Sequence, residues 1–81
     1  MLVKILGPGC ANCVNLERVT REALADLGVH AEVRKVTEYA EIAAYGVMST
    51  PGLVVDDHVL VAGRVPTRER VKELLAPLLR A

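Results

Sequence analysis

Aromatic side chains are almost absent from this sequence of 81 residues, which has two tyrosines and neither tryptophan nor phenylalanine. Proteins that bind single-stranded nucleic acid commonly stack its bases on aromatic rings, and this chain has no such set. An excess of charge is also missing, because ten lysine and arginine residues balance ten aspartate and glutamate residues. A neutral chain offers no basic surface for a phosphate backbone or an anionic membrane. We therefore expect no nucleic acid and no membrane among its partners.

Long apolar runs are missing as well. The apolar start at residues 1–6 contains Lys4 and is followed by Gly7, Pro8 and Gly9. It is too short for the apolar region of a signal peptide, and no run approaches the roughly 20 apolar residues of a membrane span. We expect one monomeric domain over residues 1–81, located in the cytoplasm. A stable structural disulfide is uncommon in that compartment.

Four short apolar segments predict β-strands at residues 1–6, 30–36, 53–55 and 59–62. The acidic pair at positions 56 and 57 is expected to form the turn of a hairpin between the last two strands. Helices are expected between the other strands and after the hairpin. The resulting order β-α-β-α-β-β-α predicts an α/β fold in which three helices flank a four-stranded mixed sheet.

The first helix is expected at residues 11–27, ended by Gly28. Its apolar face consists of Leu16, Val19, Ala23, Leu24 and Leu27. The side chains expected to face water are Glu17, Arg18, Arg21, Glu22 and Asp26. A short second helix is expected between an N-cap at Thr37 and Gly46, and Thr67 is the expected N-cap of the last helix.

Two cysteines, Cys10 and Cys13, form a C-x-x-C motif between the first strand and the first helix. The start of a helix carries unpaired N–H groups and a partial positive charge, which favour a thiolate. Gly7 and Gly9 let the loop turn sharply and expose the first sulfur. Thiol–disulfide exchange needs an accessible thiol of low pKa and a neighbouring thiol that resolves the mixed disulfide. The motif therefore predicts Cys10 as the nucleophile and Cys13 as the resolving thiol.

Other uses of two cysteines are compatible with this motif. They could form a structural disulfide, lie in the core, or bind zinc, although the remaining candidate ligands His30 and His58 stand apart. The loop Gly-Pro-Gly-Cys-Ala-Asn-Cys also resembles that of small heavy-metal-associated domains, which bind a soft metal through two thiolates. Those domains have the order β-α-β-β-α-β and usually a methionine where this chain has Pro8. A copper or zinc carrier is therefore an alternative.

A further motif, Thr50-Pro51, lies just before the penultimate strand, and Gly63 follows the hairpin. With the C-x-x-C after the first strand and a C-terminal helix, these features resemble the thioredoxin-like superfamily, in particular its glutaredoxin-sized redox-active disulfide proteins. The resemblance implies a thioredoxin-like fold, with a cis peptide bond before Pro51 and this proline beside the cysteine pair. It also implies that Thr50, Pro51 and Gly63 bind substrate, Thr50 presenting its backbone groups to an extended chain.

The sequence departs from the family pattern at three places, one of which is Gly9, where thioredoxins typically have a tryptophan before the motif. Thioredoxins have a buried acidic residue on the strand that enters the motif, whereas this chain has Lys4 six residues before Cys10. Lys4 can point to solvent and is not an acidic residue. The group that accepts the proton of Cys13 is therefore not identified. Glutaredoxins that bind glutathione tend to have a second glycine and an acidic residue after the hairpin, and here Arg64 and Val65 follow Gly63. Use of glutathione is therefore not expected.

Taken together, the motifs predict a thiol–disulfide oxidoreductase of the thioredoxin or glutaredoxin type. Its partners are expected to be a protein or a small molecule that contains a disulfide, and a separate reductase that restores the dithiol. No cofactor is expected, because the cysteine loop is the one glycine-rich stretch and no flavin or nucleotide motif is present. The alternatives are the soft-metal carrier and an interaction module that keeps the fold without catalysing exchange.

Overall fold

The structure, a computed structural model, describes residues 1–79. The elements follow the order β1 (Leu2–Leu6), α1 (Ala11–Asp26), β2 (Glu32–Val36), α2 (Tyr39–Ala44), β3 (Gly52–Val55), β4 (His58–Ala62) and α3 (Arg68–Leu79). The predicted order and fold class are confirmed. No helix of the described part is long and apolar enough to cross a membrane.

The four strands form one mixed sheet in the order β2-β1-β3-β4. β1 pairs in parallel with β2, whereas β3 pairs antiparallel with both β1 and β4. Asp56 and Asp57 both have positive φ angles, of 46° and 68°, and form the tight turn between β3 and β4. The parallel pair matters for the site, because it brings the carboxyl ends of β1 and β2 to the same edge of the sheet.

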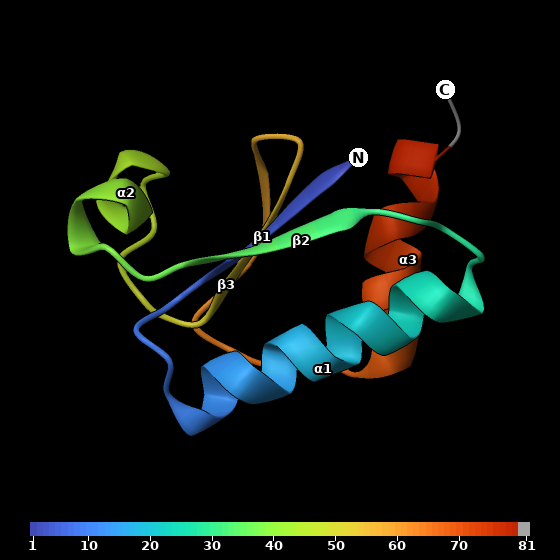
Figure 1. Cartoon of the computed structure of the whole chain (residues 1–81), viewed down its shortest axis with the longest axis horizontal. Helices are drawn as coiled ribbons and strands as arrows, with labels where there is room; N and C mark the ends of the chain where they lie inside the picture. Colours follow the sequence, from blue (N-terminus) through green and yellow to red (C-terminus); the bar gives the residue numbers. More distant parts are fainter. Residues whose placement is uncertain (80–81) are drawn as a thin grey trace.

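Helices cover both faces of the sheet (Figure 1). On one face α1 and α3 pack over β1 and β3, and Leu16, Leu53 and Leu75 of this larger cluster are completely buried. On the other face α2 covers a smaller cluster, to which Leu6 and Ile42 contribute. Successive residues of a strand point to opposite faces, so β1 supplies Val3 and Ile5 to one cluster and Leu6 to the other.

Of the two predicted N-caps, one is confirmed and the other is wrong. Thr67 caps α3, because its Oγ1 accepts a hydrogen bond of 3.1 Å from the Arg70 N–H. The prediction for Thr37 is wrong: the N-cap position of α2 is Glu38, which makes no side-chain capping bond. The first helical hydrogen bond runs from the Ile42 N–H to the Glu38 carbonyl, so Thr37 lies one residue too early to cap it.

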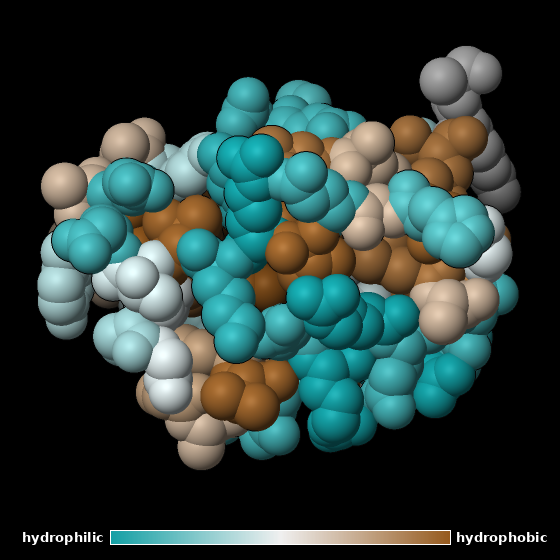
Figure 2. Space-filling view, viewed as in Figure 1, coloured by the Kyte–Doolittle hydropathy of each residue, from teal (hydrophilic) through white to brown (hydrophobic). Residues whose placement is uncertain are grey.

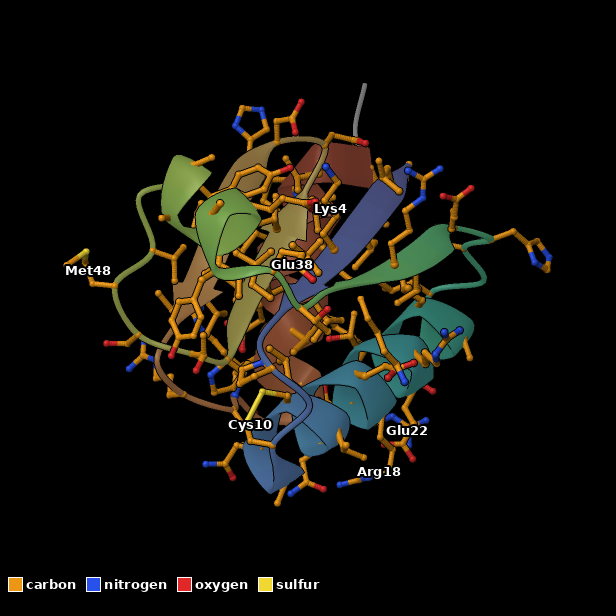
Figure 3. The ribbon with its side chains drawn as sticks, turned by 60° about the vertical axis from the view of Figure 1, so that its left-hand side comes forward. Lys4, Cys10, Arg18, Glu22, Glu38 and Met48 are labelled. Atoms are coloured by element: carbon orange, nitrogen blue, oxygen red, sulfur yellow. A yellow bond between two sulfur atoms is a disulfide. The ribbon has the colours of Figure 1, made fainter. Side chains whose placement is uncertain are left out.

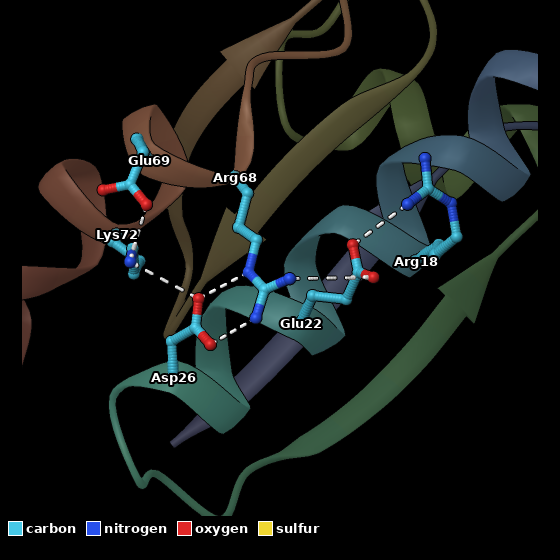
Figure 4. Close-up of polar contacts among 6 residues, drawn as sticks. All are labelled: Arg18, Glu22, Asp26, Arg68, Glu69 and Lys72. Carbon is cyan, nitrogen blue, oxygen red and sulfur yellow. Dashed lines mark hydrogen bonds and ion pairs between the residues drawn. The ribbon is translucent and has the colours of Figure 1, made fainter.

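Charged side chains join α1 to α3 at the end of α1 that lies far from the cysteines (Figure 4). The Arg68 guanidinium donates two hydrogen bonds to the Asp26 carboxylate, and Lys72 Nζ lies 3.4 Å from the same group. Glu22 lies 3.9 Å from Arg68 and also pairs with Arg18 at 3.0 Å. These contacts tie the two helices together outside the apolar core.

We expect the contact between Asp26 and Arg68 to make folding stability sensitive to acid. The hydrogen bonds from Arg68, with a smaller contribution from Lys72, lower the pKa of Asp26 from 3.8 to about 2. A carboxylate with a lowered folded-state pKa stabilises the fold above its unfolded-state pKa, and this contribution disappears as the pH falls through about 2. Urea unfolding should therefore show that Asp26→Asn is less stable than the unmodified protein at pH 7, and that the difference vanishes near pH 2.

The matched control for this prediction is Glu73→Gln, which removes a more exposed pair with Arg70 within α3. Exposed pairs within one helix contribute little, so this variant should stay close to the unmodified protein throughout. A difference between Asp26→Asn and the unmodified protein that does not change between pH 7 and pH 2 would contradict the linkage.

Candidate functional site

The two cysteines lie where β1 passes into α1, at the edge of the sheet (Figure 3). Cys10 is the N-cap residue of α1, and its Sγ accepts a hydrogen bond of 3.3 Å from the backbone N–H of Cys13. The two residues form a disulfide, with 5.0 Å between their Cα atoms. Their surroundings differ, because Cys10 is exposed whereas only 5% of Cys13 is accessible to solvent. Cys10 is therefore open to solvent, whereas Cys13 lies in the interior.

Glycine allows the close approach of β1 to the inner cysteine. Gly7 is buried, and a Cβ atom built on it would overlap Cys13 Sγ and lie 3.3 Å from Cys13 Cβ. Gly9, with φ of +95°, lies in the left-handed region that side chains disfavour. The backbone of Gly7 is further fixed by a hydrogen bond of 2.9 Å from its N–H to the Val36 carbonyl, at the end of β2.

The Thr50-Pro51 loop lies next to this junction. Its peptide bond is cis, as the family resemblance implies. Pro51 is completely buried and Thr50 is exposed. A Cβ atom built on Gly7 would overlap the Cys13 sulfur, and it would also lie 3.7 Å from the Cβ of Thr50. The loop is therefore beside the cysteine pair.

Gly63 is connected to the same loop. Its N–H donates a hydrogen bond of 2.8 Å to the Pro51 carbonyl. Its φ is +82°, and a Cβ at this position would come within 2.9 Å of Ser49 Cβ, so two constraints favour glycine here. The structure thus brings together the five residues that the sequence singled out, which are Cys10, Cys13, Thr50, Pro51 and Gly63.

Lys4 does not lie free in solvent. Its Nζ donates a hydrogen bond to the Tyr45 hydroxyl and lies 5.1 Å from the centre of that ring, and this hydrogen bond raises the pKa of Lys4. Lys4 lies between Val3 and Ile5 of the larger cluster, so it points to the opposite face of the sheet from α1. The side chain at this position is therefore directed away from the helix that carries Cys13.

Glu17 was expected to face water, and this prediction is wrong, since only 16% of its side chain is exposed. Its Oε2 accepts a hydrogen bond of 3.0 Å from Arg21 Nε, and its Oε1 lies 3.3 Å from Lys35 Nζ of β2. Together with Cys13 it lines one small cavity. The spacing of four residues from Cys13 is the signal that could have found it, because residues i and i+4 share a helix face.

Apolar side chains are exposed near the outer sulfur. Figure 2 shows apolar atoms over the first turns of α1, where Val14 is 56% exposed. Met48, just before the Thr50-Pro51 loop, is 96% exposed and projects from the molecule in Figure 3, so it does not fill the core. Within residues 1–79 no group of three or more histidine, cysteine or acidic side chains is placed to hold a metal ion.

The fold and the site define a class of protein. A cysteine pair at the start of a helix, beside a buried cis-proline on a four-stranded mixed sheet, is the arrangement of a thioredoxin-like thiol–disulfide oxidoreductase. The family model described as "Thioredoxin domain" matches residues 1–76. The chain belongs to the thioredoxin family, and its cysteine pair carries out thiol–disulfide exchange.

Two curated relatives are similar over nearly the whole chain. A thioredoxin of Methanothermobacter thermautotrophicus is 42% identical over 76 residues, which cover 94% of this chain and 99% of the relative. A thioredoxin of Methanocaldococcus jannaschii is 37% identical over 75 residues, which cover 93% of this chain and 86% of the relative. The helix between β2 and β3 also separates this fold from the β-α-β-β-α-β order of heavy-metal-associated domains.

Proposed function

We propose that the chain reduces disulfides of protein partners in the cytoplasm, with Cys10 as the attacking thiol and Cys13 as the resolving thiol. The observation that carries this assignment is the difference in exposure, since Cys10 is open to solvent and Cys13 is buried. Only an exposed sulfur can approach a disulfide on another molecule. In the reaction the Cys10 thiolate attacks one partner sulfur, the partner's disulfide bond breaks, and the other partner sulfur leaves as a thiolate.

The position of Cys10 at the N-cap supports the same assignment. Its sulfur accepts the N–H of Cys13, and the α1 terminus adds a partial positive charge. Both effects favour the thiolate over the thiol, and the thiolate is the nucleophile. The first turn of α1 contains no acidic residue that would oppose this effect.

Thr50, Pro51 and Gly63 are proposed to hold the substrate backbone. Thr50 is exposed and lies outside the helices and strands. Within the described part of the chain, its N–H and carbonyl make no hydrogen bond to another backbone group. Its N–H and carbonyl can therefore pair with an extended peptide, as an added strand does. Gly63 fixes the loop through the hydrogen bond from its N–H to the Pro51 carbonyl. This arrangement favours protein disulfides over small disulfides, and a separate reductase is needed to regenerate the dithiol.

The assignment of the two thiols can be tested by alkylating the reduced protein with iodoacetamide and mapping the product by mass spectrometry. Cys10 should react rapidly at pH 7, below the ordinary thiol pKa of about 8.5, whereas Cys13 should react slowly because it is buried. The fully unfolded protein is the control, in which both thiols should react at the same rate. Faster labelling of Cys13 in the folded protein would overturn the assignment.

A further inference from the structure

A cavity of about 30 Å³ lies beside the buried cysteine, between the end of β1, the first turns of α1 and the end of β2. Its lining includes Cys13, Glu17 and Lys35. A space of this size has room for a water molecule, and the polar side chains offer the hydrogen-bond partners that a buried water requires. Cys13 and Glu17 therefore line one common space.

The carboxylate in this cavity is held in place from two sides. Arg21, one turn further along α1, donates to one oxygen of Glu17, and Lys35 of β2 lies beside the other. Lys35 is paired in register with Ile5, whose side chain lies in the cluster under α1, so Lys35 also points toward α1. The parallel pairing of β1 and β2 thus determines which residue meets Glu17.

Glu17 is ionised at neutral pH. Burial alone would raise its pKa, but the hydrogen bonds from Arg21 and Lys35 outweigh this effect, and the pKa of Glu17 lies below its ordinary value. The neighbouring charges from α1 and β2 are therefore one carboxylate and two cations. Lys4, on the opposite face of the sheet, is directed away from this space.

We propose that Glu17 receives the proton of Cys13, through a water in this cavity, when Cys13 resolves the mixed disulfide. The inference rests on the proposed roles of Cys10 and Cys13. In this step the Cys13 sulfur forms a bond to Cys10 Sγ while the bond between Cys10 and the partner sulfur breaks. The partner sulfur leaves with the electron pair as a thiolate, and the Cys13 proton passes to the carboxylate and then to solvent.

The buried position of Cys13 explains why this step needs a proton acceptor. An ordinary thiol has a pKa of about 8.5, and burial in apolar surroundings raises it, so at pH 7 only a few per cent or less is thiolate. A carboxylate positioned to take the proton during the attack removes this limitation. Positioned general bases contribute about 10²-fold to 10⁴-fold to rate. The lowered pKa keeps Glu17 ionised throughout the neutral range, but it also makes Glu17 a weaker base than a group that titrates near pH 7, so the lower end of this range is expected.

The test compares Glu17→Gln with Glu22→Gln by following the two steps separately with a disulfide peptide. Glu22 is the matched control, because it also loses an i,i+4 arginine pair on α1 but lies farther along the helix from Cys13. In a Cys13→Ser background, Glu17→Gln should leave the rate of mixed-disulfide formation within about twofold. With Cys13 present, it should slow release of the reduced peptide by about 10²-fold, the lower end of the range for a general base.

Two further readouts separate proton transfer from a structural role. The residual release rate of Glu17→Gln should rise in proportion to hydroxide between pH 6 and pH 9, whereas that of the unmodified protein should rise less steeply. Glu17→Asp keeps a carboxylate and should recover part of the rate. Thermal unfolding of each variant reports whether the fold is retained.

Several results would overturn the inference. One is a release rate for Glu17→Gln equal to that of the unmodified protein, and another is an equal loss in Glu22→Gln. Faster release in Glu17→Gln would show that Lys35, freed from its partner, stabilises the Cys13 thiolate instead. A failure of the proposed function looks different, because then no mixed disulfide would form on Cys10 in any variant.

Discussion

A Cys10→Ser variant is expected to reduce insulin no faster than the uncatalysed reaction, whereas Cys13→Ser is expected to react once and stop. Serine at position 10 removes the exposed thiolate that makes the first bond to the substrate, and a buried thiol at position 13 cannot replace it. Serine at position 13 leaves the first step intact and removes the second. Turnover should therefore be lost in both variants, but only Cys13→Ser should accumulate a 1:1 adduct by mass spectrometry.

The same trapped adduct reports on the substrate backbone. A disulfide peptide can be methylated on one amide nitrogen at a time, which removes one hydrogen bond without changing the side chains. Methylation of the amide that pairs with Thr50 should slow trapping by about fivefold, the effect of losing a hydrogen bond of roughly 1 kcal/mol. Methylation of the adjacent amides, which point away in an extended chain, should have little effect.

An adduct on Cys13 in the Cys10→Ser variant, formed at the unmodified rate, would reverse the assigned roles of the two cysteines.

Gly7→Ala is expected to damage both the stability and the activity of the protein. The new Cβ would overlap the Cys13 sulfur in a buried site, so either the helix start or the end of β1 must shift. Overpacking of this kind costs about 1–3 kcal/mol. That is a large share of the roughly 4–12 kcal/mol expected for a chain of 81 residues. Displacing the sulfur by about 1 Å should also lower activity by about tenfold to 100-fold.

Gly9→Ala is the matched control for this prediction. Within residues 1–79, no atom outside the two neighbouring residues lies within 4 Å of a Cβ built on Gly9, although its φ of +95° is unfavourable for alanine. Urea unfolding should therefore show a loss of stability in both variants, but an increased reactivity of Cys13 toward iodoacetamide only in Gly7→Ala. If Cys13 is equally protected in the two variants, the close contact at Gly7 does not control the position of the sulfur.

Local features of the sequence were sufficient for most of the fold. The hairpin follows from two acidic residues between apolar runs, and the helix start follows from a cysteine motif behind a glycine loop. The predicted cap at Thr37 failed because α2 begins one residue later, where the Glu38 carbonyl accepts a hydrogen bond from the N–H of the buried Ile42. Local preference could not distinguish between neighbouring cap positions.

The two parts of the site differed in how well the sequence predicted them. Cys10, Cys13 and the cis-proline are recognised by spacing and family resemblance. Glu17 was assigned to the solvent face, because a helical pattern of apolar residues treats every charged side chain as exposed. Its contact with Lys35 depends on the parallel register of β1 and β2, which places Lys35 on the same face of the sheet as α1. A pairing between distant segments is not encoded in the periodicity of either one.

The length of α1 separates two properties that are often coupled in small proteins. The helix runs from Ala11 to Asp26, about 24 Å at 1.5 Å per residue, with the cysteine pair at one end and the Arg68–Asp26 contact at the other. Electrostatic effects between exposed charges fade over about 8 Å at physiological salt. Changes to the charged network should therefore alter the melting temperature while leaving the reduction potential unchanged. Resistance to heat and redox behaviour can thus be adjusted independently, each at its own end of one helix.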